Sequence, residues 1–211
     1  MNKQLLYWNN ILKKVKLQKP EYDLWLNKYE DLLHESKDIP IIDLGCGWGA
    51  DTLYLVEKGY DVIACDFSQE AIKRVRNFIP KARVKQFDML DGLPFKDKEA
   101  KLVISDLSLH YFSLIDTNRI ISEIKRVLEE NGILLCRVNS INDINYGAGQ
   151  GIQIEENFFN IDGIFKRFFD INQIDMFFRD WETIFISEYS TNKYDDKNKV
   201  LWDFAVRKIS F

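Results

Sequence analysis

Three carboxylates in this sequence each follow a short apolar run, and the first of them opens a glycine-rich loop. The loop spans residues 43–49, Asp-Leu-Gly-Cys-Gly-Trp-Gly, and the next two runs end at Asp66 and Asp88. Glycines at alternate positions permit a tight turn in which the backbone comes close to a ligand. A strand, a glycine loop and a helix N-terminus together form a common binding site for small polar ligands.

The elements that must position these carboxylates alternate along the chain. Short apolar runs flanked by glycine, proline or acids predict buried strands at residues 39–44, 61–66, 82–87, 102–105 and 133–138. Amphipathic patterns between them predict helices, the longest capped by Asp116 and ended by Gly132. This alternation is typical of an α/β fold with a parallel sheet and helices on both faces. Runs at residues 181–188 and 200–209 predict a C-terminal antiparallel hairpin.

Two further segments lie outside this alternation. Residues 1–36 have apolar side chains at helical spacing, interrupted by Pro20, which predicts an N-terminal helical cap on a main domain of residues 37–211. The cap has two possible roles: it packs on that domain, or it forms a lid over the glycine loop. Residues 140–169 are polar, rich in glycine and too long for an ordinary connection, which predicts a lid-like insertion that is functional or disordered.

Composition narrows the class of protein. The chain has 211 residues and is 46% hydrophobic, which suits one domain. Its net charge of -4 argues against a nucleic-acid partner. Cys46, Cys65 and Cys136 form no CxxC pair, so we expect buried, reduced thiols in a reducing compartment. The sequence shows no signal-peptide core and no run of membrane-spanning length, so we expect a cytoplasmic protein without a membrane partner.

The glycine loop alone leaves its ligand open. Gly45, Gly47 and Ala50 satisfy the dinucleotide pattern G-x-G-x-x-G/A, and Asp66 lies where an acid that binds ribose belongs. Both a dinucleotide and another adenosine ligand fit this spacing. Asp43, however, would repel a pyrophosphate and would favour a ligand that carries an ammonium or a sulfonium.

The ordered set of motifs resembles the class I S-adenosylmethionine-dependent methyltransferases. It comprises residues 43–49, Asp66, Phe87-Asp88-Met89, Leu93-Pro94-Phe95 and residues 107–112, Leu-Ser-Leu-His-Tyr-Phe. The resemblance implies a Rossmann-like seven-stranded, mostly parallel sheet that ends in an antiparallel hairpin. It also implies S-adenosyl-L-methionine as cofactor and S-adenosyl-L-homocysteine as product. One departure is Ala100-Lys101, where the family usually carries Phe-Asp.

The resemblance also implies roles for individual residues. Asp43 would hold the amino group of the cofactor, and Asp66 would bind its ribose hydroxyls. The remaining cofactor contacts would come from the backbone of Gly45, Cys46 and Gly47 at the methionine part, Phe67 beside the adenine, Asp88 and Met89 at the adenine edge, and Ser105 and Asp106 near the methionine part and the reacting methyl.

Catalysis and the acceptor are less well determined. A sulfonium methyl is already activated, so transfer needs no metal, and it needs a base only if the acceptor enters protonated. His110 is a candidate base or a structural histidine, and Tyr146 could face the acceptor or solvent. Aromatic residues with Glu155 and Glu156 hint at a small, partly apolar or cationic acceptor, although a protein acceptor stays open.

Three functions are compatible with the sequence. The first is methyl transfer to a small molecule by a monomer or homodimer, with aminopropyl transfer on the same fold as a minor variant. The second is a nicotinamide-dependent oxidoreductase, which the glycine spacing permits but Asp43 opposes. The third is a non-catalytic protein that binds S-adenosylmethionine. Binding of NADH would identify the second, and tight cofactor binding without turnover would favour the third.

Overall fold

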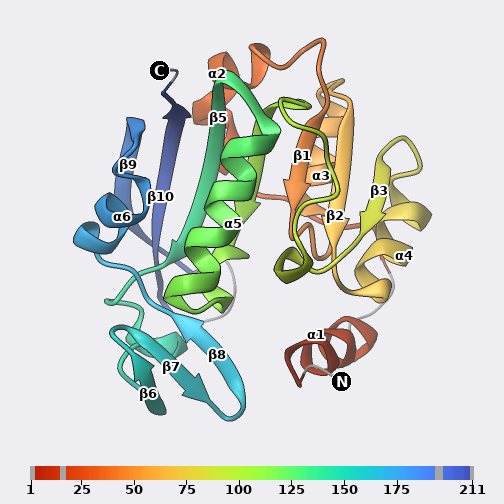
Figure 1. Ribbon diagram of the computed structural model, residues 1–211. Coiled ribbons are helices and arrows are strands. Elements are labelled where there is room, and N and C mark those ends of the chain that lie inside the picture. Colours follow the sequence, from red (N-terminus) through yellow and green to blue (C-terminus); the bar gives the residue numbers. More distant parts are fainter. Residues whose placement is uncertain (1–2, 15–17, 193–196, 210–211) are drawn as a thin grey trace.

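A central seven-stranded sheet organises the computed structural model, which describes residues 3–14, 18–192 and 197–209. Its strands are β1 (Ile41–Leu44), β2 (Val62–Asp66), β3 (Arg83–Gln86), β4 (Ala100–Asp106), β5 (Leu128–Asn139), β9 (Trp181–Thr191) and β10 (Lys199–Lys208). The spatial order is β3-β2-β1-β4-β5-β10-β9 (Figure 1). β1 to β5 run parallel, and β10 lies antiparallel between β5 and β9. The predicted Rossmann-like sheet with its antiparallel hairpin is thereby confirmed.

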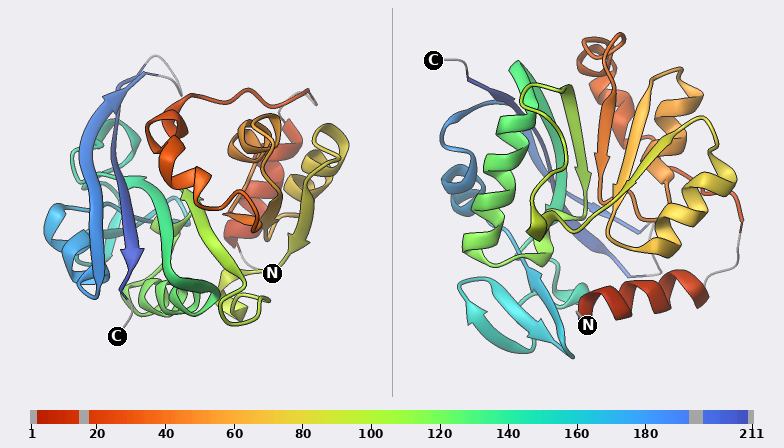
Figure 2. Two further views of the ribbon diagram at one scale, coloured as in Figure 1. Left: turned by 90° about the horizontal axis from the view of Figure 1, so that it is seen from above. Right: turned by 45° about the vertical axis from the view of Figure 1, so that its right-hand side comes forward.

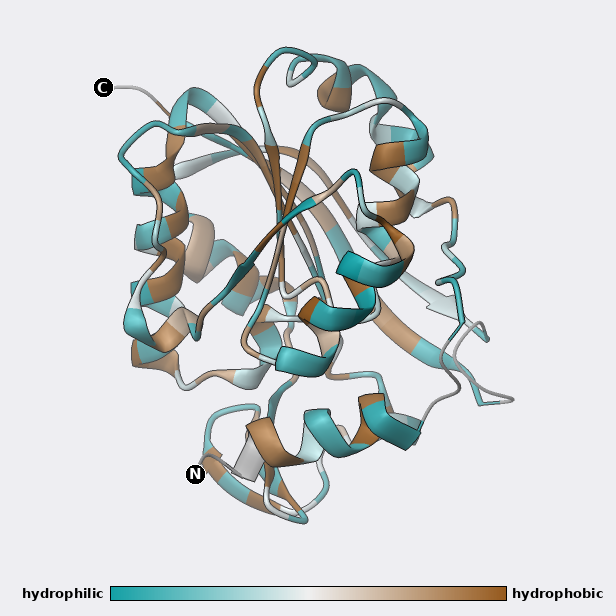
Figure 3. Ribbon diagram, turned by 90° about the vertical axis from the view of Figure 1, so that its right-hand side faces the viewer, coloured by the Kyte–Doolittle hydropathy of each residue, from teal (hydrophilic) through white to brown (hydrophobic). Residues whose placement is uncertain are grey.

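Helices cover both faces of this sheet, as Figure 2 shows from two directions. The helices are α3 (Ala50–Glu57), α4 (Gln69–Phe78), α5 (Leu114–Val127) and α6 (Ile171–Phe178). Ile120 and Ile124 of α5 and Phe178 of α6 belong to the apolar core on one face. α3 and α4 bury Leu55 and Val75 on the opposite face. In Figure 3, apolar colour concentrates along the strands between the helices.

The limits of the long helix differ from the sequence prediction. Ser113, not Asp116, caps α5, because its hydroxyl accepts a hydrogen bond of 3.1 Å from the backbone N–H of Asp116. The helix ends at Val127 rather than near Gly132, because Leu128 takes extended dihedrals of φ -71° and ψ 137°. β5 therefore begins five residues earlier than the apolar run at residues 133–138 suggested.

The N-terminal segment divides into two parts with different positions. α1 (Lys3–Lys14) lies across the carboxyl ends of the parallel strands, whereas the 3-10 helix η1 (Trp25–Tyr29) and α2 (Glu30–His34) pack on the sheet (Figure 1). Leu26 and Tyr29 are buried, and the Tyr29 hydroxyl donates a 2.5 Å hydrogen bond to Asp203 of β10. In the segment predicted as a cap, residues 1–36, η1 and α2 therefore pack into the core, whereas α1 covers the strand ends.

The insertion at residues 140–169 is ordered. It contains a small antiparallel sheet of β6 (Ile152–Glu155), β7 (Phe158–Ile161) and β8 (Ile164–Arg167). This sheet and α1 lie beneath the same edge of the main sheet (Figures 1 and 2). Part of the charged turn predicted at residues 192–199 lies outside the described residues. Among the described helices, none has the length and apolar character needed to cross a membrane.

Candidate active site

A cavity of about 1310 Å³ lies at the carboxyl ends of the parallel strands. Its walls come from those strand ends, α1 and the β6–β8 sheet, with Trp8 and Leu12 contributed by α1 and Phe158 and Phe165 by the small sheet. Of the twelve residues predicted for the site, all but Ser105 line this one cavity. The predicted site residues therefore share one cavity, and its cover comes from segments whose position the sequence left open.

The glycine loop is fastened to the neighbouring strand by its own backbone. The N–H groups of Gly45 and Cys46 both donate to the carbonyl of Cys65, at 2.8 and 2.9 Å. Gly45 has a φ of +83°, and a Cβ there would stand 2.4 Å from Cβ of Ser108. Only glycine meets both conditions, because a side chain would be strained and would also clash. Cys46 is buried on the cavity wall, and burial raises the pKa of its thiol well above the ordinary value.

Asp66 joins the glycine loop to the next helix. Its Oδ2 accepts from the backbone N–H of Gly47 at 2.9 Å, and its Oδ1 accepts from that of Ser68 at 2.8 Å. Burial raises the pKa of this carboxyl to about 6, and the two N–H donors oppose that rise. The carboxylate thus holds the turn that leads into α4, whose N-cap is Ser68, and it lies on the cavity wall, so the structural and ligand-binding interpretations are compatible.

Asp43 lies deeper, at the end of β1. It is 2% exposed, and its Oδ2 accepts a 2.5 Å hydrogen bond from the Thr52 hydroxyl. Burial raises the pKa of Asp43 to about 7, with smaller contributions from the charges of Asp106 and Asp66. A cationic group placed in the cavity would offset this repulsion and favour the ionised carboxylates.

Asp51 is a wall residue that the sequence reasoning missed. It stands in the first turn of α3, where an acid is usually explained by the helix dipole. Here it is buried, lines the cavity and accepts a 2.8 Å hydrogen bond from Nε1 of Trp25. Burial raises its pKa well above the ordinary value. Its position directly after the glycine loop was the available signal.

Asp106 is held by a buried arginine that was also missed. Arg137 of β5 makes two contacts with its carboxylate, 2.7 Å from Nε to Oδ1 and 2.6 Å from Nη2 to Oδ2. Arg137 also donates to Asp23 and to the Tyr189 hydroxyl, at 3.1 and 3.0 Å. A lone arginine within an apolar strand is a signal, since burial of its charge requires partners.

Ser105 does not line the cavity, contrary to the prediction. Its side chain is fully buried, and its hydroxyl is 2.6 Å from that of Ser108, which in turn donates to the carbonyl of Leu44 at 2.7 Å. Ser108, and not Ser105, lines the cavity. The alternation of side chains along β4 separates Ser105 from Asp106, which lines the cavity, because successive residues point to opposite faces.

The far side of the predicted cofactor region contains Phe67, Asp88 and Met89. Oδ1 of Asp88 accepts from the backbone N–H of Leu90 at 3.0 Å, so this acid caps a short 3-10 turn, η2 (Met89–Asp91). Its second carboxylate oxygen can accept from a ligand. Arg74 stacks on Trp48, 4.9 Å from the ring centroid, at the same end of the cavity.

His110 and Tyr146 line the other half of the cavity. His110 is 2% exposed, and its Nδ1 has no hydrogen-bond partner within the described part of the chain. Burial lowers the pKa of His110 well below its usual value, with smaller effects from Lys199 and Lys166, so the ring is neutral. The Tyr146 hydroxyl lies 3.5 Å from the Lys197 carbonyl.

The two glutamates that hinted at a cationic acceptor lie outside the cavity. Glu155 forms an ion pair with Arg167 and accepts from the backbone N–H of Leu114 at 2.8 Å. Gln173 and Arg167 donate to the backbone carbonyl of Glu156. Neither carboxylate is therefore placed to recognise a ligand.

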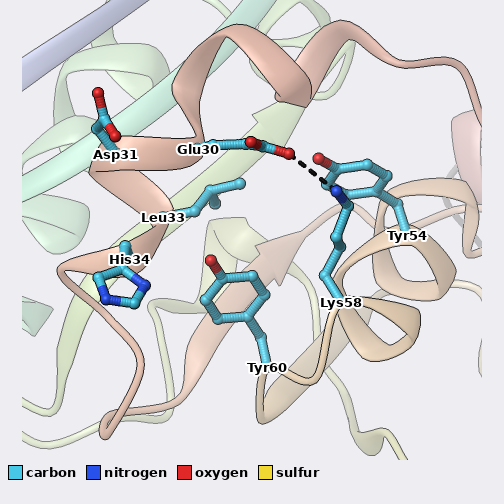
Figure 4. Close-up of a pocket in the computed structure, with 7 residues that line it drawn as sticks. All are labelled: Glu30, Asp31, Leu33, His34, Tyr54, Lys58 and Tyr60. Atoms are coloured by element: carbon cyan, nitrogen blue, oxygen red, sulfur yellow. Dashed lines mark hydrogen bonds and ion pairs between the residues drawn. The ribbon is translucent and has the colours of Figure 1, made fainter.

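A second, smaller hollow of about 310 Å³ lies at the opposite edge of the main sheet (Figure 4). Glu30 and Lys58 form a 2.8 Å ion pair across it, beside Tyr54, Tyr60 and the exposed His34. Open α/β sheets bind ligands at the carboxyl ends of their strands. This hollow lies away from those ends and is separate from the large cavity.

Comparisons with known proteins agree with this geometry. Residues 42–136 match the family model described as a methyltransferase domain. An uncharacterized methyltransferase of Synechocystis is 36% identical over 93 residues, which are 44% of this chain and 43% of that relative. The chain matches about half or less of the length of its curated relatives.

Two solved structures share the fold at low sequence identity. An S-adenosylmethionine-dependent methyltransferase of Methanosarcina mazei has a TM-score of 0.76 at 19% identity, covering 91% of this chain and 100% of that one. The 1,6-didemethyltoxoflavin-N1-methyltransferase of Burkholderia thailandensis, solved with S-adenosylhomocysteine, has a TM-score of 0.64 at 14% identity, covering 99% and 80%. These findings together support the predicted resemblance to methyltransferases, and the neighbours named as S-adenosylmethionine-dependent agree with the predicted cofactor. Residues 42–136 thus match a methyltransferase domain, and the fold is that of solved S-adenosylmethionine-dependent methyltransferases.

Proposed function

We propose that this protein transfers a methyl group from S-adenosylmethionine to a small-molecule acceptor. The observation that carries the proposal is the single covered cavity, in which the acids predicted for the cofactor and a separate aromatic, basic half face the same space. A volume of about 1310 Å³ exceeds the 300–1,000 Å³ typical of ligand pockets, so there is room for a cofactor and an acceptor together.

The residues present suit the cofactor. Asp43 and Asp51 are buried acids with raised pKa values, so a cationic amino group and sulfonium would relieve their mutual repulsion. Asp66 would exchange part of its hydrogen bonding for the ribose hydroxyls, and Asp88 with Met89 would meet the adenine edge. Ser108 and Asp106 take the place near the methionine part that we had assigned to Ser105 and Asp106.

When bound, the cofactor supplies an activated methyl group for in-line displacement. The protein's own residues then have to align the acceptor and exclude water. We propose that α1 and the β6–β8 sheet form the lid that does so, with Trp8 and Tyr111 in edge-to-face contact at 5.6 Å between ring centroids. Neutral His110 can accept a proton from an acceptor that enters protonated, which makes it the candidate base.

Calorimetric titration with S-adenosylhomocysteine, with NADH in parallel, tests the cofactor half of the proposal. We expect saturable binding of S-adenosylhomocysteine alone. Binding of NADH alone would move the protein to the oxidoreductases. Turnover of S-adenosylmethionine over a panel of small acceptors tests the second half, and tight binding with no turnover would favour a non-catalytic role.

A further inference from the structure

Charge is segregated along the cavity. The acids Asp43, Asp51 and Asp66 surround the glycine loop, whereas the half beneath the small sheet contains two lysines, Lys166 of β8 and Lys199 of β10. The side chains of both lysines are mostly or fully removed from solvent, and burial lowers both pKa values. These two ammonium groups lie in the half of the cavity away from the residues predicted to bind the cofactor, so they are available to a different ligand.

A buried acid, Asp143, pairs with one of the two ammonium groups. Asp143 is fully buried, and its Oδ2 is 3.1 Å from Nζ of Lys199, while its Oδ1 accepts from the backbone N–H of Val200 at 3.0 Å. Asp143 raises the pKa of both lysines, and Lys199 lowers that of Lys166. Lys166 itself donates, at 3.5 Å, to the neutral backbone carbonyl of Tyr146. Asp106 and Arg137 also act on Lys199, but they pair with each other and their charges offset. The two lysines and Asp143 therefore leave this half of the cavity electropositive.

Two buried polar atoms beside the lysines have no hydrogen-bond partner among the residues described. They are Nδ1 of His110 and Oδ1 of Asn139, both in side chains that are 2% exposed and line the cavity. A buried polar atom without a partner is unfavourable, so these two atoms on the cavity wall are available to bind a polar ligand group. Asn139 offers an acceptor for a hydroxyl or amino group, and neutral His110 can donate or accept.

The remaining walls of this half are flat and apolar. Phe158 and Phe165 stack with ring centroids 5.7 Å apart and an interplanar angle of 22°. Tyr146 and Tyr111 add two more rings to the lining. Such walls suit a planar or aromatic body, whose faces contact the rings while its polar substituents reach the lysines and Asn139.

We propose that the methyl acceptor is a small aromatic anion whose negative group binds between Lys166 and Lys199. Its hydroxyl or amino group is directed at Asn139 and His110. This inference rests on the proposed function and names the class of its acceptor. It replaces the cationic acceptor that the glutamates had suggested.

A matched pair of fluorescent probes tests the charge preference without knowledge of the acceptor. 1-Anilinonaphthalene-8-sulfonate is an aromatic anion, and N-phenyl-1-naphthylamine is the same aromatic body without the anionic group. Each is titrated into the full chain saturated with S-adenosylhomocysteine, whose binding is first measured by calorimetry. We expect the anion to bind one site at least tenfold more tightly than the neutral probe.

Lysine variants assign that preference to the site. We expect Lys166→Met and Lys199→Met each to weaken binding of the anion at least fivefold and to leave the neutral probe within twofold, with Lys166→Arg restoring the anion. Lys58→Met, in the hollow of Figure 4, is the matched control and should change neither affinity. Circular dichroism and the affinity for S-adenosylhomocysteine show whether each variant is folded.

The outcomes separate the two proposals. Equal affinity for the two probes, no binding of the anion, or full affinity in folded Lys166→Met and Lys199→Met would each overturn the anionic acceptor. Failure of S-adenosylhomocysteine to bind the native chain would instead overturn the proposed function. Displacement of the bound anion by 2-naphthoate or by 1-naphthyl phosphate supports the proposal and tells a carboxylate from a phosphate, and displacement by neither contradicts it.

Discussion

Oδ2 of Asp66 accepts a 2.9 Å hydrogen bond from the backbone N–H of Gly47, so the strand β2 and the glycine loop are joined through one carboxylate. The same carboxylate is the group we expect to bind the ribose hydroxyls. One side chain therefore adds to the backbone hydrogen bonds that position the loop and is also expected to recognise the ligand.

Asp66→Ala should abolish binding of S-adenosylhomocysteine, because it removes the ribose acceptor and frees the loop. Asp66→Asn keeps one oxygen for Gly47 and should retain folding while affinity falls at least tenfold. Calorimetry measures both. His110→Ala is the control that should leave cofactor affinity unchanged, and normal affinity in the Asp66→Ala variant would contradict the assigned position of the ribose.

Cofactor binding should weaken as pH falls, whereas the unliganded protein should gain stability. The folded pKa values of Asp43 and Asp66, about 7 and about 6, lie above the ordinary value of 3.8, so the folded chain binds more protons than the unfolded chain between about pH 4 and pH 7. These two groups therefore make the free energy of unfolding fall as pH rises through that window. An ammonium ligand favours the ionised carboxylates and reverses the trend.

We accordingly expect the affinity for S-adenosylhomocysteine to drop by roughly tenfold per pH unit below about pH 6, for uptake of one proton. Calorimetry at pH 5.5, 6.5 and 7.5 measures the slope, and thermal melts without ligand measure the opposite trend. A flat affinity profile would mean that neither carboxylate changes its protonation when the ligand binds.

Gly45→Ala should destabilise the fold itself. Its Cβ would lie 2.4 Å from Cβ of Ser108 at a φ of +83°, and both are unfavourable for alanine. We expect a loss of about 2 kcal/mol or more in the free energy of unfolding, measured with urea. Gly59→Ala is the control, because it shares a positive φ of +90° but has nothing within 4 Å of the added Cβ. A similar loss in both variants would assign the effect to the dihedral alone.

Arg137→Met should cost about 3–5 kcal/mol of stability, because it leaves Asp106 without its buried partner. The exposed pair Arg83–Asp61 provides the comparison, and Arg83→Met should cost about 1 kcal/mol or less. Urea unfolding of both variants measures the difference. Equal losses would show that Arg137 makes no larger contribution than a surface ion pair.

Trp8→Ala should raise the KM for the acceptor with little effect on stability, because Trp8 covers the cavity from α1 and lies outside the main core. Steady-state kinetics with the first acceptor that turns over would measure this. Leu6→Ala is the control, since Leu6 lies on the same helix, is exposed, and does not line the cavity. An equal change in KM for both would assign the effect to the helix rather than to its indole.

The sequence was sufficient for the main sheet, and nearly all the residues it predicted for the cofactor line one cavity. Buried runs such as residues 62–66 are short and end in acids, and the fold places their carboxyl ends at one edge. The local sequence was enough to predict these acids because each of Asp43, Asp66 and Asp88 accepts a hydrogen bond from a residue within nine positions of it.

Long-range pairing could not be read from the sequence. Arg137 with Asp106, and Trp25 with Asp51, are brought together only by the tertiary fold. The small β6–β8 sheet was missed because its strands are four residues each and rich in polar side chains. Nothing in the sequence marked Lys166 and Lys199, since they line the same cavity only in the folded chain.

β10 has a consequence for biosynthesis. It is translated after the six other strands of the main sheet, yet it lies between β5 and β9 and carries both Lys199 and Asp203. Asp203 accepts hydrogen bonds from Lys28 and Tyr29, at the other end of the chain. Pairings of such large sequence separation form slowly. A nascent chain on the ribosome therefore cannot close the core or complete the electropositive half of the cavity until β10 has emerged.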